Sequence, residues 1–169
     1  MSDFVAGIQT LKVLGIDPGS RITGYGVVEK QRSGLVELLQ GEIRPAKHDS
    51  FSSAMVAIYD QLTAVIDKTA PDAVAIEDIF YGKNIKSLIK QGHVRGVAIL
   101  VGAIRGIPVF EYAPLEIKQA VVGYGRAEKS QVQMMVARIL HLHTIPPADA
   151  ADALAVAICH LNFSKAQPI

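Results

Sequence analysis

The chain has 169 residues, half of them hydrophobic, and a formal net charge of +1. This length suits one domain, and the hydrophobic content excludes an intrinsically disordered chain. No apolar run approaches the roughly 20 residues of a membrane span, and residues 1–10 lack a signal-peptide pattern, so we expect a cytoplasmic protein. The single cysteine, Cys159, excludes an internal disulfide and is expected as a small buried hydrophobe.

Three strands are predicted at the start of the chain. Leu11–Asp17 is a short apolar run that ends at a Pro-Gly turn. Thr23–Lys30 follows after a short connection, and its Gly24 and Gly26 indicate that a neighbour or a ligand approaches the backbone closely. Leu35–Arg44 is the third strand. Two short connections favour an antiparallel meander.

The pattern then changes to strands that alternate with helices. In chain order we expect helix Ser50–Lys68, strand Asp72–Asp78, helix Lys86–Arg105, strand Ile107–Tyr112, and helices Pro114–Val122, Ala127–His141 and Ala148–Asn162. This order predicts an α/β fold with a mixed five-stranded sheet and helices on both of its faces. We expect a single domain over residues 1–169, with residues 1–10 as an N-terminal extension and residues 164–169 as a short tail.

Four carboxylates lie in apolar surroundings, where charged residues are rare. Asp17 ends the first strand, and Glu77 lies near the end of the compact strand after Pro71. Asp149 and Asp152 are three residues apart, so they share one face of a helix that is apolar nearly all round. The many alanines of this helix allow it to approach the sheet closely.

Each carboxylate also has a structural interpretation. Asp17 could open a turn, and Glu77 could mark a strand that emerges into solvent. Asp149 lies in a first helical turn, where the helix dipole favours a carboxylate. Asp152 is harder to explain in this way because its neighbours are apolar.

If the four carboxylates converge, their mutual repulsion requires cations between them. Hard oxygen ligands in a small cluster suit Mg²⁺ or Mn²⁺. Two such ions roughly 4 Å apart can activate water and stabilise the leaving oxygen during phosphodiester hydrolysis. The residues therefore favour a metal-dependent nuclease.

Five segments resemble the RuvC family of Holliday-junction resolvases. They are Leu14–Val28 (LGIDPGSRITGYGVV), Ala75–Phe80 (AIEDIF), Arg95–Ala98 (RGVA), Ala127–Val132 (AEKSQV) and Ala148–Ala155 (ADAADALA). The resemblance runs from about Val13 to His160, in the family's order and spacing.

The resemblance implies a ribonuclease-H-like fold and a homodimer that makes paired symmetric nicks in four-way DNA junctions during recombination and repair. It places Asp17, Glu77, Asp149 and Asp152 on the family's catalytic, metal-binding positions, with two Mg²⁺ ions per site and Mn²⁺ able to substitute. The helix Lys86–Arg105 offers an apolar face for the dimer. This face has Val97, Ile99, Leu100, Val101 and Ile104. The bacterial branch-migration motor complex is a further expected partner.

Several residues are candidates for contacts with DNA. Phe80 matches a family aromatic that stacks at the crossover, and Lys118 and Lys129 match family lysines near the scissile phosphates. The basic candidates that rest on spacing or on a glycine-rich turn are Lys83, Lys86, Lys90 and Arg126. Packed or solvated roles are the alternative for the aromatic and for the basic stripe.

Three other functions remain open. Ile16–Gly24 resembles the first phosphate loop of actin-like ATPases and sugar kinases, although 169 residues are few for their two domains. A non-catalytic module that binds junctions could have the same fold. A related nuclease could act on RNA–DNA hybrids instead.

Overall fold

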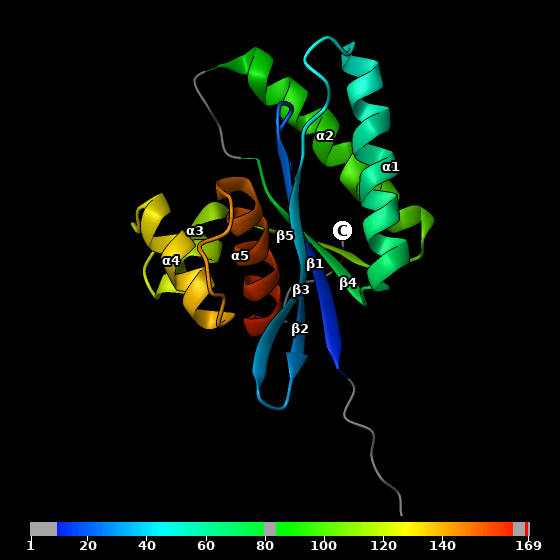
Figure 1. The fold of residues 1–169 in the computed structure, drawn as a ribbon. Helices are drawn as coiled ribbons and strands as arrows, with labels where there is room; N and C mark the ends of the chain where they lie inside the picture. Colours follow the sequence, from blue (N-terminus) through cyan, green and yellow to red (C-terminus); the bar gives the residue numbers. More distant parts are fainter. Residues whose placement is uncertain (1–9, 80–83, 164–167, 169) are drawn as a thin grey trace, which may run out of the picture.

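The computed structural model describes residues 10–79, 84–163 and 168. Its five strands form one mixed sheet in the order β3-β2-β1-β4-β5 (Figure 1). The strands are β1 Leu11–Asp17, β2 Thr23–Gln31, β3 Gly34–Ile43, β4 Ala73–Glu77 and β5 Val109–Tyr112. The first three make the expected antiparallel meander, and β4 and β5 add to β1 in parallel. The predicted element order is confirmed.

Helices cover both faces of the sheet, as expected (Figure 1). They are α1 Phe51–Thr69, α2 Ile85–Ile104, α3 Pro114–Val122, α4 Lys129–Ile139 and α5 Ala148–Asn162. On one face, side chains of α1 and α2 such as Ile58 and Val94 pack with Leu14 and Ile16 of β1. On the other face, α3, α4 and α5 form a second apolar cluster. Alternate residues of the central strands therefore serve two separate cores.

Local capping sets several helix ends. The Ser50 side chain accepts the Ser53 N–H at the start of α1, and Asn84 accepts the Ser87 N–H at the start of α2. The α4 helix starts two residues later than predicted because Glu128 caps it, and the Gln131 side chain accepts the Glu128 N–H. None of the helices within the described part of the chain is long and apolar enough to cross a membrane.

The α5 helix lies against β1 and β2 at positions where these strands have glycines. A Cβ atom on Gly15 of β1 would overlap the carbonyl oxygen of Ala153, and one on Gly24 of β2 would overlap that of Asp149. The strand glycines thus admit the neighbour that the sequence indicated, and this neighbour is α5 itself. From Ala150 to Leu161 every α5 residue except Asp152 is buried. Asp152 is half-buried.

Candidate active site

The ends of two parallel strands bring Asp17 and Glu77 together. Ile16 of β1 lies opposite Ile76 of β4, so the next residue of each strand meets the other at the carboxyl end of the sheet. Residues an even number of positions before Asp17 and Glu77 point to the same face of the sheet. Two of them, Val13 and Ala75, pack into the core that contains α5. Asp17 and Glu77 therefore belong to the face that α5 covers.

The first two turns of α5 supply the other two carboxylates. Asp149 and Asp152 lie three residues apart, and the helix passes over β2 and β1 at Gly24 and Gly15. One carboxylate oxygen from each of Asp17, Asp149 and Asp152 lies within 4.8 Å of the others. Glu77 joins this group through a hydrogen bond between its side chain and that of Asp17. The four carboxylates converge, which is the condition that the sequence prediction of a metal site set, and we call them the carboxylate cluster.

Burial and like charge both oppose ionisation of three members of the carboxylate cluster, which are Asp17, Glu77 and Asp152. Burial raises the pKa of Asp17 to about 8, and the charges of Glu77, Asp152 and Asp149 add to this effect. Burial also raises the pKa of Glu77 and of Asp152. In each of these two residues the nearby Lys129 partly offsets the increase. At neutral pH the metal-free Asp17 thus retains a proton that a bound cation would displace.

The donor set of the carboxylate cluster fits a hard divalent cation. Its closest ligand atoms are carboxylate oxygens, which Mg²⁺ and Mn²⁺ prefer over softer donors. A cation between them would relieve the repulsion that raises the pKa of Asp17. The residues therefore fit the metal that the sequence predicted.

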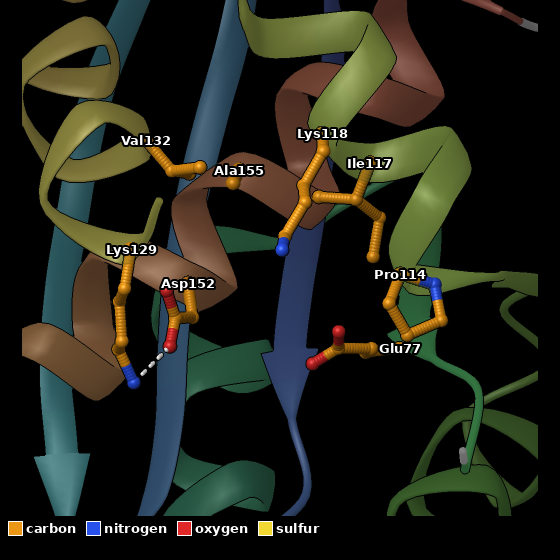
Figure 2. A pocket seen from close by; sticks show the side chains of 8 residues that line it. All are labelled: Glu77, Pro114, Ile117, Lys118, Lys129, Val132, Asp152 and Ala155. Carbon is orange, nitrogen blue, oxygen red and sulfur yellow. Dashed lines mark ion pairs between the residues drawn. The ribbon is translucent and has the colours of Figure 1, made fainter. Parts of the chain in front are cut away.

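Two lysines border the carboxylate cluster. Lys118 of α3 and Lys129 of α4 line a pocket together with Glu77 and Asp152 (Figure 2). The Nζ atom of Lys129 is 2.7 Å from the Oδ2 atom of Asp152. Burial lowers the pKa of Lys129, but the hydrogen bond and charge of Asp152 outweigh this and raise it. Figure 2 shows the Lys118 amine extending toward the space between Asp152 and Glu77. Both lysines therefore place positive charge beside the acidic site.

Three other candidates for DNA contacts are not among the residues that line this pocket, namely Lys86, Lys90 and Arg126. Lys86 and Lys90 are exposed near the N-terminal end of α2, and the Lys90 amine lies 5.8 Å from the centre of the Phe51 ring. Arg126 is exposed between α3 and α4. Phe80 and Lys83 lie outside the described residues.

Glu42 of β3 is a carboxylate near the site that the sequence analysis missed. Its Oε1 atom accepts the N–H of Asp149 at 3.3 Å, and its Oε2 atom accepts hydrogen bonds from Arg44. Glu42 and Asp149 are 107 residues apart in the chain. An isolated glutamate in a strand of mixed polarity gives no local sign of such a contact.

Two other reactive side chains of α5 are enclosed in the core. Cys159 is buried, as predicted, and burial raises the pKa of its thiol to about 12, which excludes a nucleophilic thiolate at neutral pH. The Nδ1 atom of His160 lies 2.8 Å from the hydroxyl oxygen of Tyr112. Burial lowers the pKa of His160, which favours the neutral ring beside this hydroxyl. These groups support packing between α5 and β5.

Comparison with known proteins identifies relatives along nearly the whole chain. Residues 13–160 match the family model described as crossover junction endodeoxyribonuclease RuvC. The protein of that name from Geotalea uraniireducens is 51% identical over 154 residues, which are 91% of this chain and 90% of the relative. The one from Ruminiclostridium cellulolyticum is 52% identical over 154 residues, which are 90% of this chain and 93% of the relative.

Solved structures agree with the sequence relatives. Thermus thermophilus RuvC, in complex with Holliday junction substrate, has a TM-score of 0.88 and 32% identity, covering 94% of this chain and 99% of its own. The yeast mitochondrial Holliday junction resolvase Ydc2 shares the fold, with a TM-score of 0.65 and 15% identity over 90% of this chain and 78% of its own. The expected ribonuclease-H-like fold is confirmed. The chain belongs to the RuvC family of crossover junction endodeoxyribonucleases.

Proposed function

We propose that this protein is a metal-dependent endonuclease that resolves four-way DNA junctions by paired symmetric nicks. The observation that carries the proposal is the carboxylate cluster, in which residues from β1, β4 and α5 meet. The T. thermophilus relative, at a TM-score of 0.88, was solved with a Holliday junction substrate. The proposed setting is homologous recombination and DNA repair in the cytoplasm, by a single nuclease domain over residues 1–169.

Asp17, Glu77, Asp149 and Asp152 are the proposed catalytic residues, and they would hold two Mg²⁺ ions, or Mn²⁺ in their place. Bound at this site, the ions would activate water and stabilise the leaving oxygen of the scissile phosphodiester. Asp17 is the central member, because the charges of all three other carboxylates act on it. Asp17 would therefore hold metal together with the other three carboxylates.

The lysines of the pocket are proposed to hold the phosphate that is cut. Lys118 and Lys129 place two positive charges at the border of the carboxylate cluster, where the DNA backbone must enter. Because Lys129 already pairs with Asp152, it also keeps that carboxylate oriented before a cation binds. We further propose that Phe80, Lys83, Lys86, Lys90 and Arg126 contact the arms or the crossover of the junction.

Family membership disfavours the ATPase alternative. We propose that the segment Ile16–Gly24 instead serves the nuclease site. Asp17 would be a metal ligand, and Gly24 leaves the space in which α5 contacts β2. The remaining alternatives are a binding module that does not cut and a nuclease for RNA–DNA hybrids. Direct comparison of substrates separates them.

The test is a cleavage assay on a synthetic mobile four-way junction, a linear duplex of the same sequence and an RNA–DNA hybrid, each with and without Mg²⁺. We expect paired nicks in opposing strands of the junction, with Mg²⁺ present. Cleavage should also weaken steeply as salt is raised at subsaturating enzyme, since phosphate contacts release counterions. Binding without cutting under any divalent ion would favour the non-catalytic module, and preference for the hybrid would favour the ribonuclease.

We propose that the active form is a homodimer joined through α2. The exposed surface of α2 has an apolar stripe at helical spacing, which consists of Ile85, Ile89, Leu100 and Ile104. A shallow groove in this surface is lined by Ile89 and Leu100 of the stripe together with Gly96 and Val97. Val101, which the sequence analysis assigned to the same face, instead packs into the core with Val74 and Val109, because the helix turns it toward the sheet. A dimer of two-fold symmetry suits a junction with matching symmetry, and the branch-migration motor complex is a further proposed partner.

Leu100→Glu should weaken the dimer. The leucine side chain is 51% exposed, so a glutamate fits the isolated monomer but would bury a charge in the proposed interface. We expect sedimentation to show monomers at concentrations where the unchanged protein is dimeric, and paired nicking to be lost. Leu38→Glu, at a leucine on β3 with 42% exposure, is the matched control and should stay dimeric. A dimeric Leu100→Glu variant would exclude this surface.

A further inference from the structure

The start of α5 has no local cap. Pro147 occupies the cap position, and its side chain makes no capping hydrogen bond. The first N–H groups of a helix lack partners within the helix, and a side chain from the preceding residue normally accepts one of them. In α5 the acceptor comes instead from β3, where the Glu42 carboxylate receives the N–H of Asp149. A proposed catalytic residue is therefore held through its own main chain by a distant strand.

Glu42 divides its two oxygen atoms between two partners. The Oε2 atom accepts the Nε and Nη2 groups of Arg44, at 3.1 and 2.5 Å. The Oε1 atom is left to accept the N–H of Asp149. The Glu42 side chain is 11% exposed, whereas that of Arg44 is 61% exposed. A carboxylate that is nearly buried and fixed by a guanidinium has few orientations, so it is a rigid support for the helix.

The sheet register aligns this support with the carboxylate cluster. Glu42 of β3 pairs with Gly24 of β2, which in turn pairs with Asp17 of β1. Because Gly24 has no side chain, the carbonyl group of Asp149 packs directly against its backbone. A Cβ atom on residue 24 would overlap the carbonyl oxygen of Asp149. The carbonyl of Asp149 thus lies against β2 while its N–H binds β3. These two contacts fix the helix start from which the Asp149 side chain reaches Asp17.

We propose that Glu42, held by Arg44, is a positioning residue that sets where the Asp149 carboxylate meets the metal. It acts by accepting the main-chain N–H of Asp149, which anchors the start of α5. This inference rests on the proposed function of the carboxylate cluster. It adds a residue that binds neither the cation nor the scissile phosphate and yet determines the geometry of the site.

The test is the Mg²⁺ dependence of Glu42→Ala. Residues that orient a metal ligand typically contribute about 10- to 100-fold to metal affinity or activity. We therefore expect the Mg²⁺ concentration for half-maximal junction cleavage to rise about tenfold, with junction affinity measured in Ca²⁺ or EDTA unchanged. Isothermal titration calorimetry with Mg²⁺ alone should show the same weakening without any substrate. Glu37→Ala, on the same strand, is the matched control and should leave all these values unchanged.

Two further variants separate positioning from simple stabilisation. Glu42→Gln retains an oxygen that can accept the N–H of Asp149, so its Mg²⁺ affinity should return to within about threefold of the unchanged protein. Arg44→Ala leaves Glu42 in place but less constrained. Its Mg²⁺ affinity should therefore lie between those of Glu42→Ala and Glu42→Gln. These variants also serve if Glu42→Ala does not fold.

The outcomes distinguish this inference from the proposed function. A Glu42→Ala protein that melts at a lower temperature but binds Mg²⁺ normally would overturn positioning and leave a structural role. Equal losses in Glu42→Gln and Glu42→Ala would also overturn it, because they would mean that the charge itself is required. Absence of junction cleavage by the unchanged protein would defeat the proposed function, while calorimetry with Mg²⁺ would still decide the role of Glu42.

Discussion

Asp17→Asn should reduce junction cleavage by about a thousandfold, equivalent to about 4 kcal/mol of transition-state stabilisation. Asp17 lies where β1 ends, and the charges of the other three carboxylates act on it. An asparagine keeps the shape but removes the charge that a cation requires. Junction affinity should change little, because phosphate contacts are assigned to lysines and arginine. Single-turnover cleavage and gel-shift titration measure the two properties separately.

The same substitution should stabilise the protein when metal is absent. The pKa of Asp17 in the folded state is about 8, far above its ordinary value of 3.8, so the folded state holds this proton more tightly than the unfolded state. Stability of the metal-free protein therefore falls as pH rises from about 4 to about 8, where the folded carboxyl finally ionises. Asp17→Asn has no carboxyl to ionise at this position, so it avoids this loss of stability. At pH 8 its free energy of unfolding should exceed that of the unchanged metal-free protein by on the order of 2 kcal/mol.

Thermal melts in EDTA and in Mg²⁺ check the prediction that Asp17→Asn is more stable than the unchanged protein only when metal is absent. In EDTA the variant should melt about 4–8 °C above the unchanged protein at pH 8, with a smaller difference at pH 5. Added Mg²⁺ should raise the melting temperature of the unchanged protein more than that of the variant. Asp60→Asn, at an exposed position of α1, is the matched control and should cut normally. Full activity of Asp17→Asn would place the catalytic site elsewhere.

Gly15→Ala should destabilise the fold by on the order of 3 kcal/mol, because one methyl group has no space to enter. Its Cβ atom would overlap the carbonyl oxygen of Ala153 and lie 2.7 Å from the N atom of Ala157. Both are backbone atoms of a buried helix, which cannot rotate away as a flexible side chain could. The helix must shift from the sheet, and Asp149 and Asp152 shift with it.

Thermal unfolding and cleavage assays measure the two consequences of Gly15→Ala. We expect the melting temperature to fall by about 6–12 °C and cleavage to decrease even at temperatures where the variant is folded. Gly96→Ala is the matched control for the unfolding measurement alone, because Gly96 lines the groove of the proposed dimer interface. A Cβ atom there meets nothing within 4 Å, and alanine favours a helix more than glycine does. Equal stability of the Gly15 variant and the unchanged protein would show that α5 does not depend on this close contact.

The sequence by itself determined the elements and the acidic residues of the site. The apolar runs that end at Asp17 and Glu77 predict strands, and the alanine-rich run around Asp152 predicts a buried helix, because periodicity and breakers act over a few residues. The strand Gly24 indicated a close neighbour before that neighbour was known. Charges in such apolar segments indicated a cation site, since burial without a partner is costly.

Tertiary structure alone decided how these parts meet. Glu42 contacts a helix more than a hundred residues away, and Lys129 reaches Asp152 from another helix, so no local pattern records either contact. The face of β1 to which Asp17 belongs depends on sheet register, in which a shift by one residue would reverse every side chain. The high pKa of Asp17 likewise depends on burial and on three charges that come from elsewhere in the chain. These properties depend on distances between segments remote in sequence, and such distances exist only after the chain has packed.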